Sequence, residues 1–219
     1  MMLLGKPLIA HSIEQARASD LFETVAVSSD SADILATADT WGADLLIQRP
    51  GEMATDHAAK LPVIQHAARE AEAESGIRYD TFVDLDATSP LRFPEDILGA
   101  VQLLEARGVS QVITGKEARH SPYFNLVECD SEGRVRLSKR VEPLIVRRQD
   151  APKCFDMNGS VYVWSRDGLF NLEPPFNSDA LLYEMPEERS VDIDSPLDAQ
   201  FVQFLMEARC ADISDSTQR

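Results

Sequence analysis

The sequence predicts an α/β fold in which helices cover a mostly parallel β-sheet. Three observations lead to this prediction. The chain of 219 residues is long enough for one substantial core. Short β-rich apolar runs alternate with amphipathic stretches through its first half, and strands separated by helices favour right-handed crossovers and parallel pairing. No internal repeat or low-complexity linker interrupts the pattern, so we expect one domain over residues 1–219.

Apolar residues at helical spacing predict helices over residues 7–19, 31–41, 62–75, 94–106 and 196–209. Pro7 suits the first turn of the first helix, where its missing N–H would have no partner. Gly42 ends the second helix. In the third, Ile64, Ala67 and Ala71 give an Ala- and Glu-rich stretch one apolar face.

Buried strands are expected over residues 24–28, 44–48, 81–85, 111–114, 160–164 and 181–184. Turn-prone residues close the first two, namely Ser29-Asp30-Ser31 and Arg49-Pro50-Gly51. The alternation of expected strands and helices stops after about Glu117. There, residues 123–128 and 134–137 flank a polar turn and predict a hairpin. We interpret residues 118–150 as a β-rich excursion from the core.

The charge balance excludes one class of partner. The formal net charge of −16 argues against nucleic-acid binding, which relies on clustered Lys and Arg. No apolar run is long enough to span a bilayer, so no membrane partner is expected. The cysteines, Cys129, Cys154 and Cys210, are scattered and odd in number, which favours a reducing compartment, and we expect the cytoplasm.

The most informative local pattern is Asp192-Ile193-Asp194. In an extended segment, residues two apart point to the same side, so both carboxylates can face one cation. Mg²⁺ favours one or two carboxylates completed by water and phosphate oxygens. Two solvated acids in an acidic loop explain the same pattern.

Polar residues also come after two expected strands. Asp86, Thr88 and Ser89 come after residues 81–85, and Arg49 comes after residues 44–48. The carboxyl ends of parallel strands are where open α/β sheets bind ligands. Turn chemistry that caps the next helix accounts equally well for the Thr-Ser-Pro run, and a solvated arginine accounts for Arg49.

Two further motifs have both a functional and a structural interpretation. Asn158, before the strand at 160–164, offers a donor and an acceptor to a sugar, or simply forms an Asn-Gly turn. Arg147 and Arg148 lie in a basic cluster suited to carboxylates or phosphates. A salt-bridged surface explains that cluster unless a partner subunit brings it to a site.

The order of these motifs along the chain is more specific than any one of them. The series is Gly5-Lys6-Pro7-Leu8-Ile9, Arg49-Pro50 with Ala54-Thr55-Asp56, Thr88-Ser89-Pro90-Leu91-Arg92, Arg147-Arg148-Gln149, Asn158-Gly159, Met185-Pro186-Glu187-Glu188-Arg189-Ser190 and Asp192-Ile193-Asp194. It closely resembles the acylneuraminate cytidylyltransferases, or CMP-sialic acid synthetases, from about Leu4 to Glu207.

The resemblance implies a Rossmann-like three-layer sandwich of the nucleotide-diphospho-sugar-transferase type. It also implies a homodimer in which the excursion reaches into the neighbouring subunit. The implied substrates are CTP and a sialic-type nonulosonic acid, whose anomeric hydroxyl attacks the α-phosphorus while pyrophosphate leaves. By this resemblance Asp192 and Asp194 hold Mg²⁺ and Arg148 approaches the partner's active site. The implied substrate-binding residues are Arg49, Lys60, Asp86, Thr88, Ser89, Asn158 and Tyr162.

Three departures from the family pattern qualify these expectations. Members normally begin with a strand and a Gly-, Arg- and Lys-rich phosphate loop, whereas nothing precedes Met1 here, so we expect this polypeptide alone to be inactive or very weak. Asp86 stands where sialic-acid enzymes usually carry Gln, which makes another nonulosonic acid plausible, such as a legionaminic-acid derivative. Lys60 stands where a small hydroxylated residue often faces the base.

Four alternatives therefore stay open beside a sialic-type acid. Three of them are the same reaction on a different substrate: legionaminate, pseudaminate or the eight-carbon acid KDO. The fourth is a non-catalytic dimeric protein that binds sugar nucleotides.

Overall fold

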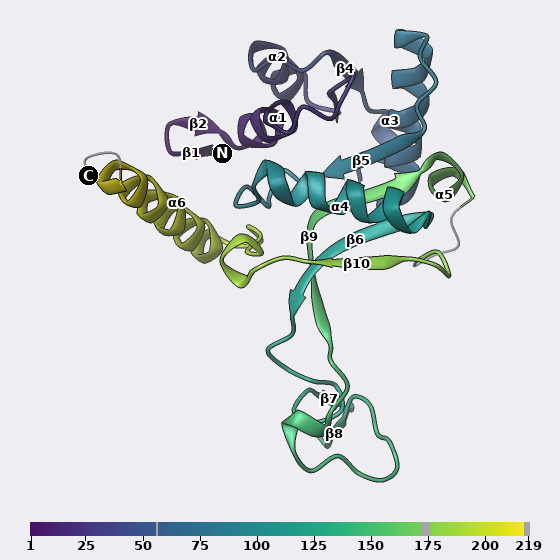
Figure 1. The fold of residues 1–219 in the computed structure, drawn as a ribbon, viewed down its shortest axis with the longest axis vertical. Helices are drawn as coiled ribbons and strands as arrows, with labels where there is room; N and C mark the ends of the chain where they lie inside the picture. Colours follow the sequence, from purple (N-terminus) through teal and green to yellow (C-terminus); the bar gives the residue numbers. More distant parts are fainter. Residues whose placement is uncertain (56, 172–175, 217–219) are drawn as a thin grey trace.

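The computed structural model describes residues 1–55, 57–171 and 176–216. A four-stranded sheet has the order β10-β6-β9-β5, formed by Leu181–Glu184, Gln111–Glu117, Phe155–Ser165 and Thr81–Leu85 (Figure 1). β10 is parallel to β6, whereas β9 is antiparallel to both β6 and β5. The sheet is thus mixed, because β9 returns from the excursion and enters the core in the opposite direction.

A second, parallel pair consists of β3 (Ala26–Ser29) and β4 (Leu45–Gln48). Among the described residues, no ladder joins β3 to β5. A cavity of about 1020 Å³ lies between them, lined by Val25 and Val27 on one side and by Val83 and Leu85 on the other. We call this cavity the slot.

Helices cover both faces of the sheet, which confirms the predicted α/β fold class, but this sheet is mixed where mostly parallel pairing was expected. The buried side chains of β9 alternate: Val161 and Val163 pack against α4 (Pro94–Arg107), while Trp164 packs against α3 (Lys60–Ser75) and α5 (Arg166–Phe170). Such alternation is what a strand between two helical layers requires. Near β3 the core continues between α1 (Leu8–Ala18) and α2 (Ala32–Thr40).

The chain begins with a small hairpin that the sequence pattern does not predict. β1 (Met2–Leu3) pairs with β2 (Lys6–Pro7), and Leu4 and Gly5 form the turn with φ of 48° and 77°. Leu3 is buried beside residues of the last helix, α6 (Pro196–Ser216), which is longer than expected. No helix within the described ranges has the length and apolar character needed to cross a membrane.

The expected excursion projects from the sheet between β6 and β9 (Figure 1). We call residues 118–154 the arm. Its predicted hairpin is present as β7 (Val127–Cys129) and β8 (Val135–Leu137). Several apolar side chains of the arm are exposed, and Val146, with 72% of its surface accessible, is the most exposed of these.

Candidate active site

The carboxyl end of β5 continues into a loop organised by Asp86. Its Oδ1 accepts hydrogen bonds from the backbone N–H of Thr88 at 3.3 Å and from the Thr88 hydroxyl at 2.9 Å. Gly159, with φ of 60°, lies against the carboxylate, since a β-carbon there would be 4.0 Å from Asp86 Oδ2. The loop therefore forms an Asx turn, in agreement with the interpretation of the Thr-Ser-Pro run as turn chemistry. It also holds the carboxylate of Asp86 in a fixed position.

Lys60, the first residue of α3, joins this carboxylate to a second one. Its Nζ lies 3.0 Å from Asp84 Oδ2 and 3.2 Å from Asp86 Oδ2. The ammonium also lies 4.4 Å from the centroid of the Tyr162 ring. Burial works against the charge of Lys60, but the two carboxylates outweigh it and raise its pKa. Lys60 is thus held as a cation by the site itself.

The same contacts keep Asp86 ionised. Burial would raise the pKa of Asp86, but the charge of Lys60 and the hydrogen bonds from Thr88 together hold it below its usual value. Tyr162 behaves in the opposite way, because burial first and then the neighbouring carboxylates raise the pKa of its phenol. At neutral pH the site therefore offers a carboxylate acceptor beside a protonated phenol.

The Asp192-Ile193-Asp194 segment lies beside this loop. The backbone N–H of Ile193 donates to the carbonyl oxygen of Thr88 at 2.9 Å. Burial, followed by the charges of Asp194, Asp198 and Asp86, raises the pKa of Asp192. The segment and the loop after β5 thus meet in one acidic cluster.

This donor set fits a hard divalent cation. The described residues contain no group of three or more His, Cys, Asp and Glu side chains arranged around a metal position. Mg²⁺ needs only one or two carboxylates, because waters and substrate phosphates complete its shell. Burial first, and then the neighbouring carboxylates, raise the pKa of Asp192, and a bound cation would favour its charged form.

Two predicted sugar-facing residues lie in different surroundings. Tyr162 is half-buried, and its ring stacks on Trp164 with a centroid separation of 5.7 Å. Asn158 is only 3% exposed. Its amide oxygen accepts from the Thr114 hydroxyl at 2.7 Å and its amide nitrogen donates to the Ser190 hydroxyl at 3.0 Å. The amide of Asn158 is therefore occupied by protein groups and braces the start of β9.

Ser89 and Arg49 are likewise anchored to the backbone. Ser89 is buried and its hydroxyl donates to the carbonyl of Asn158 at 3.2 Å. Arg49 Nη2 donates to the carbonyl of Ser28, the residue before the end of β3, at 2.7 Å. Arg49 and Asp86 both line the slot, so the structure places both predicted strand ends at one cavity. Asp56 of the motif series lies outside the described residues.

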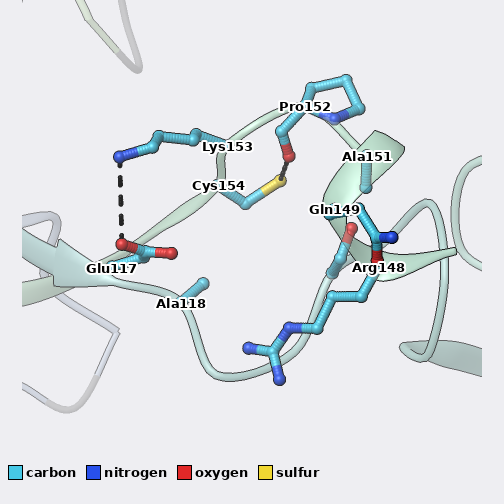
Figure 2. A pocket seen from close by; sticks show the side chains of 9 residues that line it. Glu117, Ala118, Arg148, Gln149, Ala151, Pro152, Lys153 and Cys154 are labelled. Atoms are coloured by element: carbon cyan, nitrogen blue, oxygen red, sulfur yellow. Dashed lines mark hydrogen bonds and ion pairs between the residues drawn. The ribbon is translucent and has the colours of Figure 1, made fainter.

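Arg148 is a predicted site residue that lies elsewhere, in the arm, and not in the acidic cluster formed by Asp192 and the loop after β5. It lies in a 3₁₀ turn of the arm, Arg148–Asp150, and lines a separate cavity of about 380 Å³ (Figure 2). Its guanidinium donates to the carbonyl of Arg119 at 2.9 Å. Across this cavity Lys153 lies 3.9 Å from Glu117. Within this chain Arg148 therefore lines the arm's own cavity, and the slot that Arg49 and Asp86 line does not include it.

Two residues of the site, Asp84 and Arg92, were given no role from the sequence. Asp84 shares Lys60 with Asp86, and the signal was available, because residues two apart on a strand point to one face. Arg92 is only 1% exposed and donates to the carbonyls of Asp86 and Ser160 at 2.9 and 2.8 Å. Burial lowers the pKa of Arg92 to about 10, so it stays charged at neutral pH. No spacing rule predicts such a clamp.

Comparison with known proteins shows which proteins this chain is similar to. A CMP-N,N'-diacetyllegionaminic acid synthase of Campylobacter jejuni is 39% identical over 199 residues, covering 91% of this chain and 83% of that protein. An N-acylneuraminate cytidylyltransferase of Escherichia coli is 30% identical over 203 residues, covering 90% of this chain and 45% of that protein. The solved structure of a CMP:2-keto-3-deoxy-manno-octonic acid synthetase complexed with CTP has the same fold, with a TM-score of 0.65 and 17% identity over 95% of this chain and 91% of that one.

The family assignment rests on a match that covers most of the chain. A family model described as cytidylyltransferase matches residues 1–183. The predicted resemblance is thereby confirmed, as is the expectation of a nucleotidyltransferase. The chain belongs to the cytidylyltransferase family.

Proposed function

We propose that this protein transfers CMP from CTP to a nonulosonic acid, and that the acid is of the legionaminic or sialic type. The observation that carries the proposal is the hydrogen bond from Ile193 to Thr88, which sets two carboxylates beside the loop at the end of β5. A nucleotide triphosphate and its cation need such a convergence of acidic ligands and strand-end groups.

The side chains of the site divide into three parts in this proposal. Arg49, at the end of β3 and on the slot, contacts the nucleotide. Asp86 accepts and Tyr162 donates hydrogen bonds to the hydroxyls of the sugar acid, as their opposite pKa shifts support. Thr88, Ser89 and Asn158 position that loop, and Lys60 neutralises Asp84 and Asp86 so that the anionic substrate can approach.

Asp192 and Asp194 would hold Mg²⁺ in this arrangement. When bound, the ion neutralises the charge that develops on the phosphates during displacement. The protein's own contribution is positioning: it aligns the anomeric hydroxyl of the sugar acid with the α-phosphorus and leaves a path for pyrophosphate.

We also propose a homodimer in the cytoplasm. The exposed apolar side chains of the arm, such as Val135 and Val146, support association because a monomer gains nothing from exposing them there. A two-fold dimer would exchange arms reciprocally, and Arg148 would then reach the neighbouring cluster. The scattered cysteines and the use of CTP support the location.

The substrate choice rests on Asp86 and on the relatives. Asp86 carries a negative charge that the usual Gln lacks, so it favours an acid whose nearby substituent donates hydrogen bonds. The similarity to a relative named as a legionaminic acid synthase points the same way. We therefore place N,N'-diacetyllegionaminate ahead of N-acetylneuraminate, pseudaminate and KDO.

The test is pyrophosphate release by the purified chain with CTP and Mg²⁺, with each of the four acids in turn. The proposal expects release with one acid at least tenfold faster than with the others, and none with ATP or UTP. Binding of CMP-sugars without any turnover would instead establish a non-catalytic sugar-nucleotide-binding protein.

A further inference from the structure

Arg209, in the second half of α6, joins the two segments that meet at the acidic cluster. Its Nη1 donates to the carbonyl oxygen of Leu91 at 2.8 Å, and its Nη2 donates to the carbonyl oxygen of Glu188 at 2.7 Å. Leu91 follows Thr88 in the loop after β5, and Glu188 precedes Asp192 in the segment before α6. One planar guanidinium therefore connects the loop to the segment that carries the acidic pair.

These contacts give the two segments a second point of attachment. At the first point, the backbone N–H of Ile193 donates to the carbonyl oxygen of Thr88 at 2.9 Å. At the second point, Arg209 binds Leu91 and Glu188. A single hydrogen bond would let one segment pivot against the other, whereas two separate attachments fix their relative orientation. Functional groups need supporting contacts of this kind to stay in place.

The packing of α6 shows that Arg209 has a use besides attaching the helix. Val202, which is fully buried, and Leu205 belong to the apolar cluster that includes Leu3 and Leu91. Burial of an apolar face supplies most of the stability of a docked helix. The contacts of Arg209 come in addition to this packing, and they go to the backbone of the two segments at the site.

The surroundings of Arg209 are unfavourable for a cation. Burial, and then the charge of Arg189, lower the pKa of Arg209. The guanidinium carbons of Arg209 and Arg189 lie 4.8 and 5.1 Å from the centroid of the Phe93 ring. The buried carboxylate of Asp96 accepts from Arg189 at 2.8 Å. A partly buried cation beside another cation lowers stability, so the two hydrogen bonds to carbonyls offset a cost that an apolar residue would avoid.

We propose that Arg209 is a positioning residue for the pair Asp192 and Asp194. It holds Leu91 and Glu188 at a fixed separation and thereby keeps the pair against the loop after β5. The inference rests on the proposed function in treating the two aspartates as metal ligands. The position of their segment can be measured without metal or substrate, so a failure of the inference is distinguishable from a failure of the proposed chemistry.

The experiment follows the amide of Ile193 in Arg209→Met, which keeps an apolar stem and removes the donors. Hydrogen exchange at Ile193, measured by NMR in EDTA without nucleotide, should become about tenfold faster. The amide of Met185, which donates to the carbonyl oxygen of Gly115 at 2.8 Å, should change by less than about twofold. Arg209→Lys keeps the charge without the planar fork and should give an intermediate rate at Ile193.

Arg17→Met is the matched control. Arg17, in the last turn of α1, also donates to a backbone carbonyl, that of Gly42 at 2.7 Å, but neither segment belongs to the acidic cluster. This variant should leave exchange at Ile193 unchanged. An unchanged rate at Ile193 in Arg209→Met overturns the proposal. An equal rise at Ile193 and Met185 also overturns it, because it would show a general loss of stability.

Mn²⁺ binding provides a second readout, with the free ion followed by electron paramagnetic resonance. The affinity should be about tenfold lower in Arg209→Met than in Arg17→Met. Equal affinities in the two variants would overturn the positioning role even if exchange at Ile193 were faster. If the unaltered protein bound no Mn²⁺, the proposed metal site would fail, and exchange at Ile193 would decide the role of Arg209 by itself.

Discussion

The backbone N–H of Ile193 and the carbonyl oxygen of Thr88 lie 2.9 Å apart, in a hydrogen bond between segments that are distant in the sequence. This bond fixes the segment that carries Asp192 and Asp194 against the loop after β5. Because residues two apart in an extended segment point to one side, the two carboxylates can act together. This junction and the residues around it determine how the protein should respond to substitution.

Removing either carboxylate should abolish most of the activity without unfolding the protein. We expect Asp192→Asn and Asp194→Asn each to lower kcat about 10²-fold or more at saturating CTP, because both proposed metal ligands are needed to neutralise phosphate charge. Pyrophosphate release measured over a range of Mg²⁺ concentrations is the readout. Glu74→Gln, an exposed acid on α3, is the control and should retain full activity. Unchanged kcat in both aspartate variants would remove Asp192 and Asp194 from the mechanism.

The raised pKa of Asp192 gives this residue an unusual effect on stability. Burial and neighbouring carboxylates hold its folded-state pKa above the ordinary value of 3.8. The folded state then binds more protons than the unfolded state between these two values, so stability falls as the pH rises through that window. In EDTA at pH 7, Asp192→Asn should therefore raise the unfolding temperature, and the gain should shrink towards pH 4.

Asp198 provides a control of opposite sign for that experiment. Its carboxylate accepts hydrogen bonds from the hydroxyl and the backbone N–H of Ser195 at 2.7 and 2.8 Å, and these lower its pKa. Asp198 therefore stabilises the folded state when the pH is above the ordinary pKa of an aspartate. This stabilisation is lost as the pH falls through the lower pKa that Asp198 has in the folded state. Asp198→Asn should accordingly lower the unfolding temperature at pH 7. Identical pH profiles for the two variants would contradict this assignment.

Lys60 should be coupled energetically to Asp86. A double-mutant cycle of Lys60→Met and Asp86→Asn, measured by urea unfolding, should give a coupling of about 1 kcal/mol, since the side chain of Lys60 is 46% exposed and solvent screens the pair. The Lys6–Glu14 pair, of similar exposure, is the matched comparison for a single exposed ion pair. A coupling of zero between Lys60 and Asp86 would show that the two charges act independently.

The clamp formed by Arg92 should matter more for folding than any exposed cation. Arg92→Met removes the charged donor that the carbonyls of Asp86 and Ser160 share and leaves each with one longer backbone hydrogen bond, so we expect a loss of about 3 kcal/mol in the free energy of unfolding. Arg107→Met, at the exposed end of α4, should change it by no more than about 0.5 kcal/mol. Urea denaturation of both variants measures these changes in the free energy of unfolding.

A mixing experiment tests whether Arg148 acts across a dimer. Arg148→Ala and Asp192→Asn should each be nearly inactive alone. If Arg148 serves the partner's site, mixed dimers contain one site with both residues intact, and activity should return to roughly a quarter of the wild-type level after subunit exchange. No recovery, with exchange verified by mass spectrometry, would place Arg148 and Asp192 in the same subunit's site or outside catalysis.

Much of the fold could be predicted from the sequence because local patterns determine it. The apolar spacing of α3 and the β-branched run of β3 predict these elements within a few residues. The reversed direction of β9 could not be predicted, since it depends on how the arm returns to the sheet. The site divides in the same way. The Asp192-Ile193-Asp194 pattern is local, whereas the burial of Asn158 and the clamp of Arg92 arise only from tertiary packing.

The arm's exposure has a consequence for how the protein tolerates a cut chain. Most of its side chains lie in solvent, while β6 and β9 on either side of it form a long antiparallel ladder with one irregularity between Ile113 and Gly115. A protease that nicks the arm would leave both fragments bound through that ladder and through the packing of α4 on β9. New chain ends placed in the arm should therefore be accepted by the core, and the association proposed for the arm is the property that such a cut would remove.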